Sequence, residues 1–284
     1  MIDEHALYEP GHRLRGLVSW ATGYRQAGVE PARHRGLPSP WLTMIVTLDE
    51  PLVIAAHPDP RQPASAHDVL LGGLHTSPAL VTHEGCQSGI QLALTPLGAR
   101  ALLALPASEL ASIDVEGTDV LGRVATELRE RVLGAPGWPA RFAELDRFLS
   151  QRLRGDDARA RVPRPEVSHA WRRLRETRGT LSVADLAAET GWSARYLGAQ
   201  FRAETGLSPK AAARVIRFDR ARRALARRHA NGRRDFLADL AADCGYYDQA
   251  HLAREFRELA GCPPSRWLAE EFRNVQAAPP GEEE

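Results

Sequence analysis

Short apolar runs alternate with turn residues along the first half of the chain. From residue 42 to about residue 94, the runs LTMIVTL, PLVIAA, DVLLGGL, ALVTHEG and GIQLALT are separated by Gly, Pro and Asp. This pattern is typical of β-strands that lie close together in a sheet or a small barrel. Apolar residues at helical spacing then predict helices over 96–105, 119–133 and 140–153. We therefore expect an α+β domain in this half.

The second half of the chain has a helical period, with apolar residues three and four positions apart. Ser182 opens a capping box, and Leu186 lies on the apolar stripe of the short helix that follows. Gly191 ends this helix, because glycine tolerates the left-handed conformation that a tight turn between helices needs. Ser193 then caps a second helix. Helix, glycine turn and helix at this spacing predict a helix-turn-helix.

This unit occurs twice. Two matched pairs lie 54 positions apart, Leu186 with Leu240 and Gly191 with Gly245, and four lie 55 apart, Leu197 with Leu252, Phe201 with Phe256, Gly206 with Gly261 and Pro209 with Pro264. The shift of one residue falls after the turn glycine, where WS in the first copy faces YYD in the second. In the second copy we expect the first cap at Asp235 or nearby and the second cap at Asp248.

A longer helix is predicted between the two copies. Ser208 and Pro209 suit its cap and its first position, and the residues that recur on its packing face are Val215, Phe218, Arg222 and Leu225. The arginines expected off this face are Arg214, Arg217, Arg220, Arg223 and Arg227. Such a rigid connector would set the distance between the two second helices. Two successive major-groove segments lie about 34 Å apart.

Charge divides the chain in the same place, although the net charge is only +1. Residues 1–160 carry 15 basic and 19 acidic residues, whereas 161–284 carry 22 basic and 17 acidic ones. The segment 195–234 alone holds twelve basic residues against Glu204 and Asp219. A polyanion such as nucleic acid suits this segment, and a solvated helix face is the alternative that charge alone leaves open.

With these motifs in place, residues 166–273 resemble the C-terminal domain of the AraC/XylS family of bacterial transcription regulators. The second copy, GYYDQAHLAREFRELAGCPPSRW, is similar to the family signature of glycine, aromatic residue, capped turn, phenylalanine, glycine, proline and a final aromatic residue. The first copy, LSVADLAAETGWSARYLGAQFRAETGLSP, is similar as well. The resemblance implies sequence-specific binding of duplex DNA at bacterial promoters, with both second helices on one face of the DNA.

The resemblance also implies which residues contact DNA. The positions that read bases carry Arg195, Tyr196, Gln249, His251 and Arg254 in this sequence, with small Ala199 and Ala250 at two further positions. Arginine suits guanine and glutamine suits adenine. The first motif also has Gly198 on this face, so it should read little beyond what Arg195 specifies. The phosphate contacts we expect are Ser193, Arg202, Arg217 and Arg257.

The N-terminal half resembles the cupin-type sensor domain that many AraC-family regulators carry, although it has no diagnostic motif. The resemblance implies that this half binds a small-molecule effector or forms a homodimer, and RNA polymerase is a further partner. Trp20, Trp41 and Trp138 could line an effector pocket or simply pack in the core.

Two other classes of protein compete with this interpretation. A cupin-like enzyme or metal-binding protein, targeted to DNA by its C-terminal domain, would use His57, His67, His75, His83 and Cys86. These residues form no His-x-His pair, paired cysteines or Ser/His/Asp signature, so we expect no catalysis, metal or cofactor. A nucleoid-type binder without sequence preference is the third class, and the polar Gln249, His251 and Arg254 argue against it.

The composition also suggests domain boundaries and a location. The polar segment RGDDARARVPRPE predicts a linker at 154–165, between an N-terminal domain at 1–153 and a DNA-binding domain at 166–274. The acidic tail 275–284 is predicted to be disordered. The start MIDEHALYEP has no apolar segment typical of a secretory signal, and three cysteines suit a reducing compartment, so we expect a cytoplasmic protein.

Overall fold

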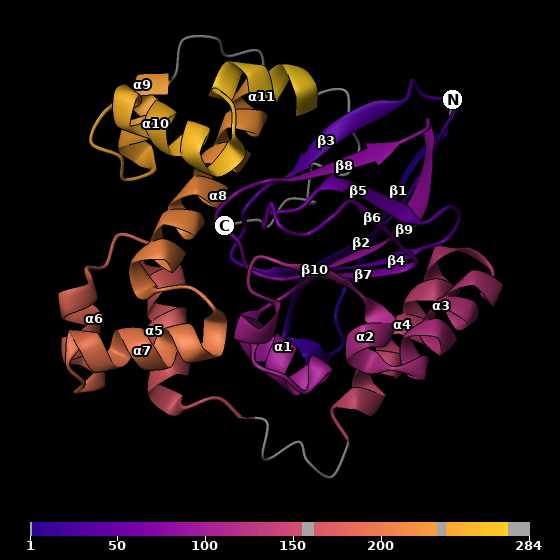
Figure 1. Cartoon of the computed structure of the whole chain (residues 1–284), viewed down its shortest axis with the longest axis horizontal. Helices are drawn as coiled ribbons and strands as arrows, with labels where there is room; N and C mark the ends of the chain where they lie inside the picture. The colour runs from indigo at the N-terminus through magenta and orange to yellow at the C-terminus, as the bar shows by residue number, and fades with distance from the viewer. Residues whose placement is uncertain (1, 155–161, 232–236, 272–284) are drawn as a thin grey trace.

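The structure is a computed structural model that describes residues 2–154, 162–231 and 237–271. A β-rich N-terminal half lies beside a helical C-terminal half (Figure 1). The predicted fold class, an α+β domain followed by an all-α domain, is confirmed. The expected linker falls largely within 155–161, and that part, the expected first cap at Asp235 and the tail 275–284 lie outside the described residues.

Two antiparallel sheets form the N-terminal half. The six-stranded sheet has the order β1 (Ile2–Tyr8), β2 (Val18–Ala27), β9 (Cys86–Leu94), β4 (Leu42–Thr47), β7 (Val69–Gly72) and β10 (Asp114–Glu116). The four-stranded sheet has the order β3 (Ala32–Gly36), β8 (Ala79–His83), β5 (Leu52–Ala56) and β6 (Ser65–His67). The five predicted runs became β4, β5, β7, β8 and β9. The strands before residue 42 were not predicted, because polar residues interrupt their apolar pattern.

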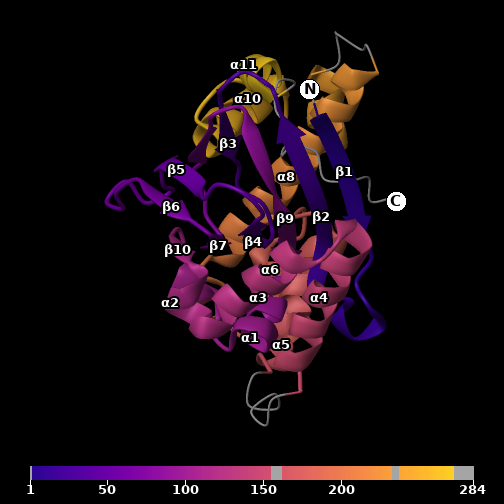
Figure 2. The same cartoon turned by 90° about the vertical axis from the view of Figure 1, so that its right-hand side faces the viewer.

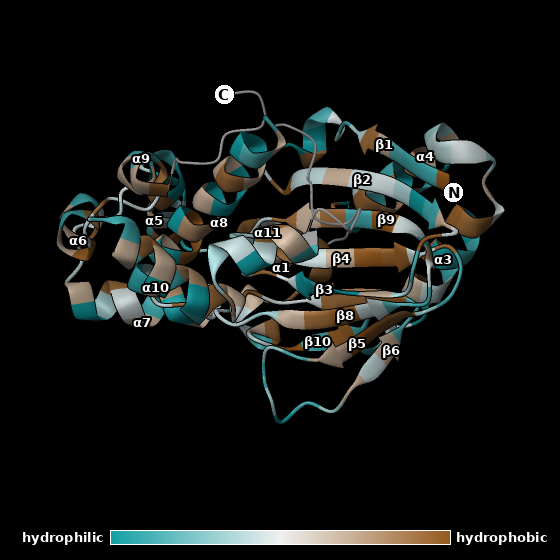
Figure 3. Cartoon of the chain, turned by 90° about the horizontal axis from the view of Figure 1, so that it is seen from above, coloured by the Kyte–Doolittle hydropathy of each residue, from teal (hydrophilic) through white to brown (hydrophobic). Residues whose placement is uncertain are grey.

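Side-chain alternation along β4 builds a core on each face of the six-stranded sheet. Met44 and Val46 point to one face and join the main apolar cluster, which includes Leu128 and Leu145 of the helices. Ile45 points to the other face and packs with Ile54 of the second sheet. Because successive strand residues face opposite ways, one strand serves both layers. Figure 3 shows the apolar stretches of the central strands in brown.

Four helices pack on the N-terminal half. They are α1 (Pro96–Leu103), α2 (Gly117–Leu121), α3 (Arg123–Gly134) and α4 (Gly137–Arg152), with short 3-10 turns at His12–Leu14 and Ala107–Leu110. Figure 2 shows them gathered on one side of the sheets. The predicted helices over 96–105 and 140–153 are confirmed. The single helix predicted over 119–133 is wrong at its start, because Gly122 adopts a positive φ of 65° and separates α2 from α3.

The C-terminal half holds two helix groups joined by one long helix. The first group is α5 (Pro165–Glu176), α6 (Val183–Thr190) and α7 (Ala194–Thr205), and the second is α9 (Leu237–Asp243), α10 (Gln249–Ala260) and α11 (Pro264–Glu271). Helix α8 (Pro209–Ala230) runs between them (Figure 1). Val215 of α8 belongs to the main apolar cluster, which the first group shares with the N-terminal half, whereas Phe218 and Leu225 belong to the cluster of the second group. One helix therefore contributes to both cores and confirms the predicted connector.

Charged and polar contacts join the two halves of the chain. Arg100 of α1 donates to both carboxylate oxygens of Glu204 in α7, at 2.7 and 2.8 Å. Ser108 donates its hydroxyl to the carbonyl of Ala203, at 2.6 Å. Arg35 of β3 donates Nε to Glu270 of α11, at 2.7 Å. Both helix groups are thus held to the N-terminal domain through their own residues.

Candidate nucleic-acid interface

Helices α6 and α7 form the first predicted helix-turn-helix. The Ser182 hydroxyl accepts the backbone N–H of Asp185 at 3.1 Å and so caps α6, as expected. Gly191 has a φ of +70° and accepts no side chain without strain, although its surroundings are open. The Ser193 hydroxyl then accepts the N–H of Tyr196 at 3.2 Å and caps α7. The predicted caps and turn are confirmed.

Helices α9 and α10 form the second motif on the same plan. Gly245 has a φ of +76°, and the Asp248 carboxylate accepts the N–H of His251 at 2.6 Å. The predicted turn glycine and second cap are therefore confirmed. A carboxylate also interacts favourably with the positive end of the helix dipole, which adds to the stability of this cap.

An aromatic residue in each turn packs against the third residue after the cap. The rings of Trp192 and Tyr196 lie edge to face, with centroids 4.9 Å apart. Tyr246 and His251 have the same arrangement at 5.2 Å. These pairs fix the start of each second helix relative to its turn. Tyr196 is thus a packing partner as well as a predicted base reader.

The other predicted base readers lie on the outer face of the second helices. Arg195, Gln249 and Arg254 are exposed, and within the described ranges their side chains have no hydrogen bond or ion pair. Tyr196 is 43% exposed, whereas the ring of His251 is half-buried against Tyr246. The structure thus leaves three polar readers free to contact a ligand, one of them in the first motif.

The predicted phosphate contacts fall into two groups. Arg202 and Arg257 are exposed near the ends of α7 and α10. The Ser193 hydroxyl is already the cap of α7, and Arg217 donates Nη1 to the carbonyl of Gly179 at 2.6 Å. The Nε of Arg217 is buried as well. One side of this guanidinium therefore holds the turn between α5 and α6.

Part of the basic excess of α8 is neutralised inside the domain. Arg214 pairs with Glu255 at 2.7 Å and also with Glu258, while Arg222 and Arg223 pair with Asp219 at 2.6 and 3.0 Å. Arg214 thus ties α8 to α10, whereas Arg222 and Arg223 pair within α8 itself. The charge of the segment 195–234 consequently overstates the positive charge that this helix offers to a polyanion.

A small cavity lies between the two sheets and reaches the helical half. It has a volume of about 110 Å³, and its lining includes Trp20, Trp41, Asp114 and Arg222. The indole N–H groups of both tryptophans are buried and have no acceptor among the residues that the structure describes. Trp41 also lies under the guanidinium of Arg175 in α5, 4.1 Å from its ring centre. Two of the three predicted tryptophans therefore line a pocket.

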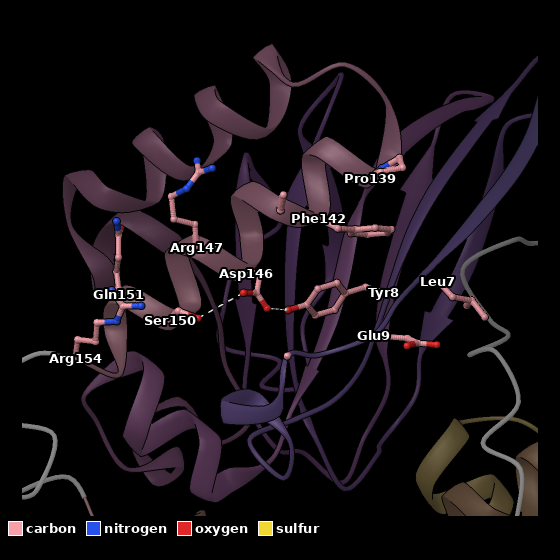
Figure 4. Close-up of a pocket in the computed structure, with 12 residues that line it drawn as sticks. Leu7, Tyr8, Glu9, Pro139, Phe142, Asp146, Arg147, Ser150, Gln151 and Arg154 are labelled. Carbon is pink, nitrogen blue, oxygen red and sulfur yellow. Dashed lines mark hydrogen bonds between the residues drawn. The ribbon is translucent and has the colours of Figure 1, made fainter.

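The third tryptophan lies near a larger, more open hollow. Trp138 stacks on Phe142 with ring centres 6.1 Å apart, and Phe142 lines a hollow of about 580 Å³ between the end of β1 and α4 (Figure 4). Inside it, Tyr8 donates its hydroxyl to Asp146 at 2.6 Å. Burial and this carboxylate raise the pKa of Tyr8. Tyr8 and Asp146 thus satisfy each other, and the other polar side chains that line the hollow include Glu9, Gln151 and Arg154.

His57 and His67, two of the histidines of the strand region, belong to a hydrogen-bonded chain between two sheet edges. His57 Nδ1 lies 2.9 Å from Asp114 Oδ2, and the Ser65 hydroxyl lies 2.9 Å from His57 Nε2 and 2.7 Å from His67 Nε2. This chain connects β6 to β10, the edge strands of the two sheets. The Ser65 hydroxyl is shared between two imidazoles, and the side chain of His57 is fully buried. We therefore assign these hydrogen bonds a structural role, which is to join the edges of the two sheets.

The candidate metal ligands do not assemble. Among the residues that the structure describes, no group of three or more His, Cys, Asp or Glu side chains could hold a metal ion. In the same part of the chain, no helix is long and apolar enough to cross a membrane.

Comparison with known proteins identifies the helical half. The family described as "Helix-turn-helix domain" matches residues 186–270, from α6 to α11. No curated protein matches the chain. Among solved structures, the apo form of a ToxT variant from Vibrio cholerae is similar over 88% of this chain and 97% of its own, with 12% identity and a TM-score of 0.50. Identity this low shows the fold alone.

A second neighbour is similar over a smaller part of the chain. The C-terminal domain of AraT, a response regulator from Geobacillus stearothermophilus, is 20% identical over 38% of this chain and 86% of its own, with a TM-score of 0.33. The family match covers both capped turns described above. Residues 186–270 are therefore a helix-turn-helix domain.

Proposed function

We propose that this protein is a sequence-specific transcription factor that binds duplex DNA at bacterial promoters through α7 and α10. One observation carries the proposal. The second helix of each motif has a capped N-terminus and exposed polar side chains, and α8 contributes to the core of both motifs. Two helices connected in this way can enter successive segments of one major groove.

The base readers have distinct roles in this proposal. Arg254 in α10 and Arg195 in α7 pair bidentately with guanine, and Gln249 pairs with adenine. His251 and Tyr196 add contacts from rings that the turn aromatics hold in place. The second motif has more polar readers, so it should specify more base pairs than the first. In the first motif, Gly198 allows close approach of the helix to the DNA and Ala199 offers only a methyl contact, so Arg195 is the main polar reader there.

Phosphate contacts come from Arg202 and Arg257, with Ser193 and Arg217 as further candidates. The two exposed arginines have the full guanidinium for a phosphate. Arg217 can use only the side that Gly179 does not occupy. Each arginine that neutralises a phosphate releases counterions and makes binding depend more steeply on salt.

The N-terminal domain supplies regulation in this proposal. A small-molecule effector would bind in the cavity beside Trp20, Trp41 and Arg222, because this cavity has unpaired donors and reaches α8. The same domain would form the contact between two copies of the chain. Bound at a promoter in the cytoplasm, such a protein would act on RNA polymerase.

Selection of bound duplexes from a random pool, at near-physiological salt, tests the proposal. The full chain should enrich a motif with two blocks about ten base pairs apart, with the sharper block under α10. Binding that falls with salt but enriches no sequence would contradict specific recognition and favour a nonspecific binder. The cavity variant Trp41→Ala is tested in the same selection. If it enriches the same motif but its binding no longer responds to an effector, the cavity serves regulation and not DNA recognition.

A further inference from the structure

Tyr247 is the residue that the second turn has and the first turn lacks. Gly191 is followed by Trp192 and the cap Ser193, whereas Gly245 is followed by Tyr246, Tyr247 and the cap Asp248. Trp192 and Tyr246 correspond, because each packs edge to face on the third residue after its cap. The added residue therefore lies between the packing aromatic and the cap.

The side chain of Tyr247 is almost completely in solvent. It is 94% exposed, more than any other large hydrophobic residue of the described part. Tyr246, directly before it, is 4% exposed. Exposing an aromatic ring is unfavourable in water, and such a ring in a monomer often marks a contact surface.

The backbone on both sides of Tyr247 is held in place. Its N–H donates to Nδ1 of His251 at 3.4 Å, and the next residue, Asp248, accepts the N–H of His251 and has an extended backbone with φ −155°. The ring is therefore presented from a fixed turn at the N-terminal end of α10, the end that enters the groove in this kind of motif.

We propose that Tyr247 is a specificity-determining DNA contact of the second motif, an inference that rests on the proposed function. The ring packs on a thymine methyl group beside the base pairs that Gln249 and Arg254 read, and the hydroxyl donates to a phosphate oxygen. An aromatic ring offers apolar contact, and a phenol offers one donor, so one side chain can do both. The added residue thus extends the DNA segment that the second motif contacts.

The experiment compares the full-length wild type with Tyr247→Ala and Tyr247→Phe in duplex selection and in titration of the selected duplex. Tyr247→Ala should weaken binding about 5- to 10-fold and remove the preference at one position that flanks the second block. Tyr247→Phe should keep that preference and weaken binding about 2- to 3-fold. Because a phenol is uncharged, neither variant should change the salt dependence of binding.

Leu7→Ala is the matched control, because Leu7 is 60% exposed in β1 and lies in the N-terminal domain. It should bind the selected duplex as the wild type does. If Tyr247→Ala binds with the affinity of the wild type and selects the same motif, this inference is overturned. The exposed ring would then be a contact for a protein partner. If the wild type enriches no motif at all, the proposed function fails and this inference fails with it.

Discussion

Arg254 is the residue on which sequence recognition by the second motif depends most in this account. Its guanidinium is exposed on α10 and has no partner among the described residues. Arg254→Ala should relax specificity at one base pair and cost about 1 to 3 kcal/mol of binding free energy. Titration of duplexes that differ at single positions checks this, with Arg266→Ala on α11 as the control. Equal weakening on every sequence would remove Arg254 from the base readers.

Arg202 and Arg217 separate a phosphate contact from a structural one. Arg202→Ala should weaken binding on all duplexes and lower the slope of log affinity against log salt by about one, because one fewer counterion is released. Arg217→Ala should weaken binding too, and it should also lower the free energy of unfolding, since the carbonyl of Gly179 loses its donor. Binding at several salt concentrations, together with urea unfolding, distinguishes the two variants. An unchanged salt slope for Arg202→Ala would contradict its assignment.

Single residues also show where sequence alone predicts the site and where it does not. The caps Ser182, Ser193 and Asp248 were predicted, because a cap is a local contact between neighbours in the chain. The partner of Arg214 was not, because Glu255 lies 41 residues further along. The exposure of Tyr247 depends on the packing around the turn, and the only sequence signal was the added residue in YYD.

Two glycines within the first motif test the element on which recognition depends. Gly191 has a φ of +70°, whereas Gly198 lies inside α7 with open space around it. Gly191→Ala should lower the free energy of unfolding by about 1 kcal/mol, because a side chain is strained in the left-handed region. Gly198→Ala should raise it by about 0.5 to 1 kcal/mol through helix propensity. Urea unfolding measures both, and equal effects would show that the turn does not require glycine.

Histidines with lowered pKa values make the stability of the N-terminal domain depend on pH. Burial lowers the pKa of His67, His75 and His83, and for His67 it outweighs the nearby carboxylate of Glu116. The unfolded chain then binds protons more readily than the folded one, so stability falls as pH decreases below about 6.5. Thermal unfolding between pH 7.5 and 5.5 should show this fall, and His67→Gln should reduce it. A midpoint that rises on acidification would contradict this account.

At the level of elements, hydrophobic period and turn residues predicted most of the helices and half of the strands that the structure describes. The runs between 42 and 94 became strands because each combines β-branched residues with flanking turn residues. Strand β1 was not predicted, because six of its seven residues are at least partly exposed and its sequence IDEHALY has no apolar alternation. It is an edge strand, and its place is decided by pairing with β2.

The whole molecule is held together by contacts that the sequence did not predict. Arg100 and Glu204 are 104 residues apart, and the carboxylate of Glu204 is only 10% exposed. Arg100→Ala should lower the free energy of unfolding by about 2 to 3 kcal/mol, because it leaves a buried charge without its partner. Arg147→Ala, which breaks the exposed pair with Glu144, should change it by less than about 0.5 kcal/mol. Equal losses of unfolding free energy in the two variants would show that the pair of Arg100 and Glu204 stabilises the protein no more than an exposed ion pair does.

In the proposed complex, α7 and α10 of one molecule occupy successive segments of the same groove. Hydroxyl-radical footprinting of the selected duplex with the full chain measures this most directly. We predict two protected patches about ten base pairs apart on one face of the DNA, with Arg254→Ala weakening only the patch under α10. A single patch, or uniform protection without a phase, would contradict the double motif.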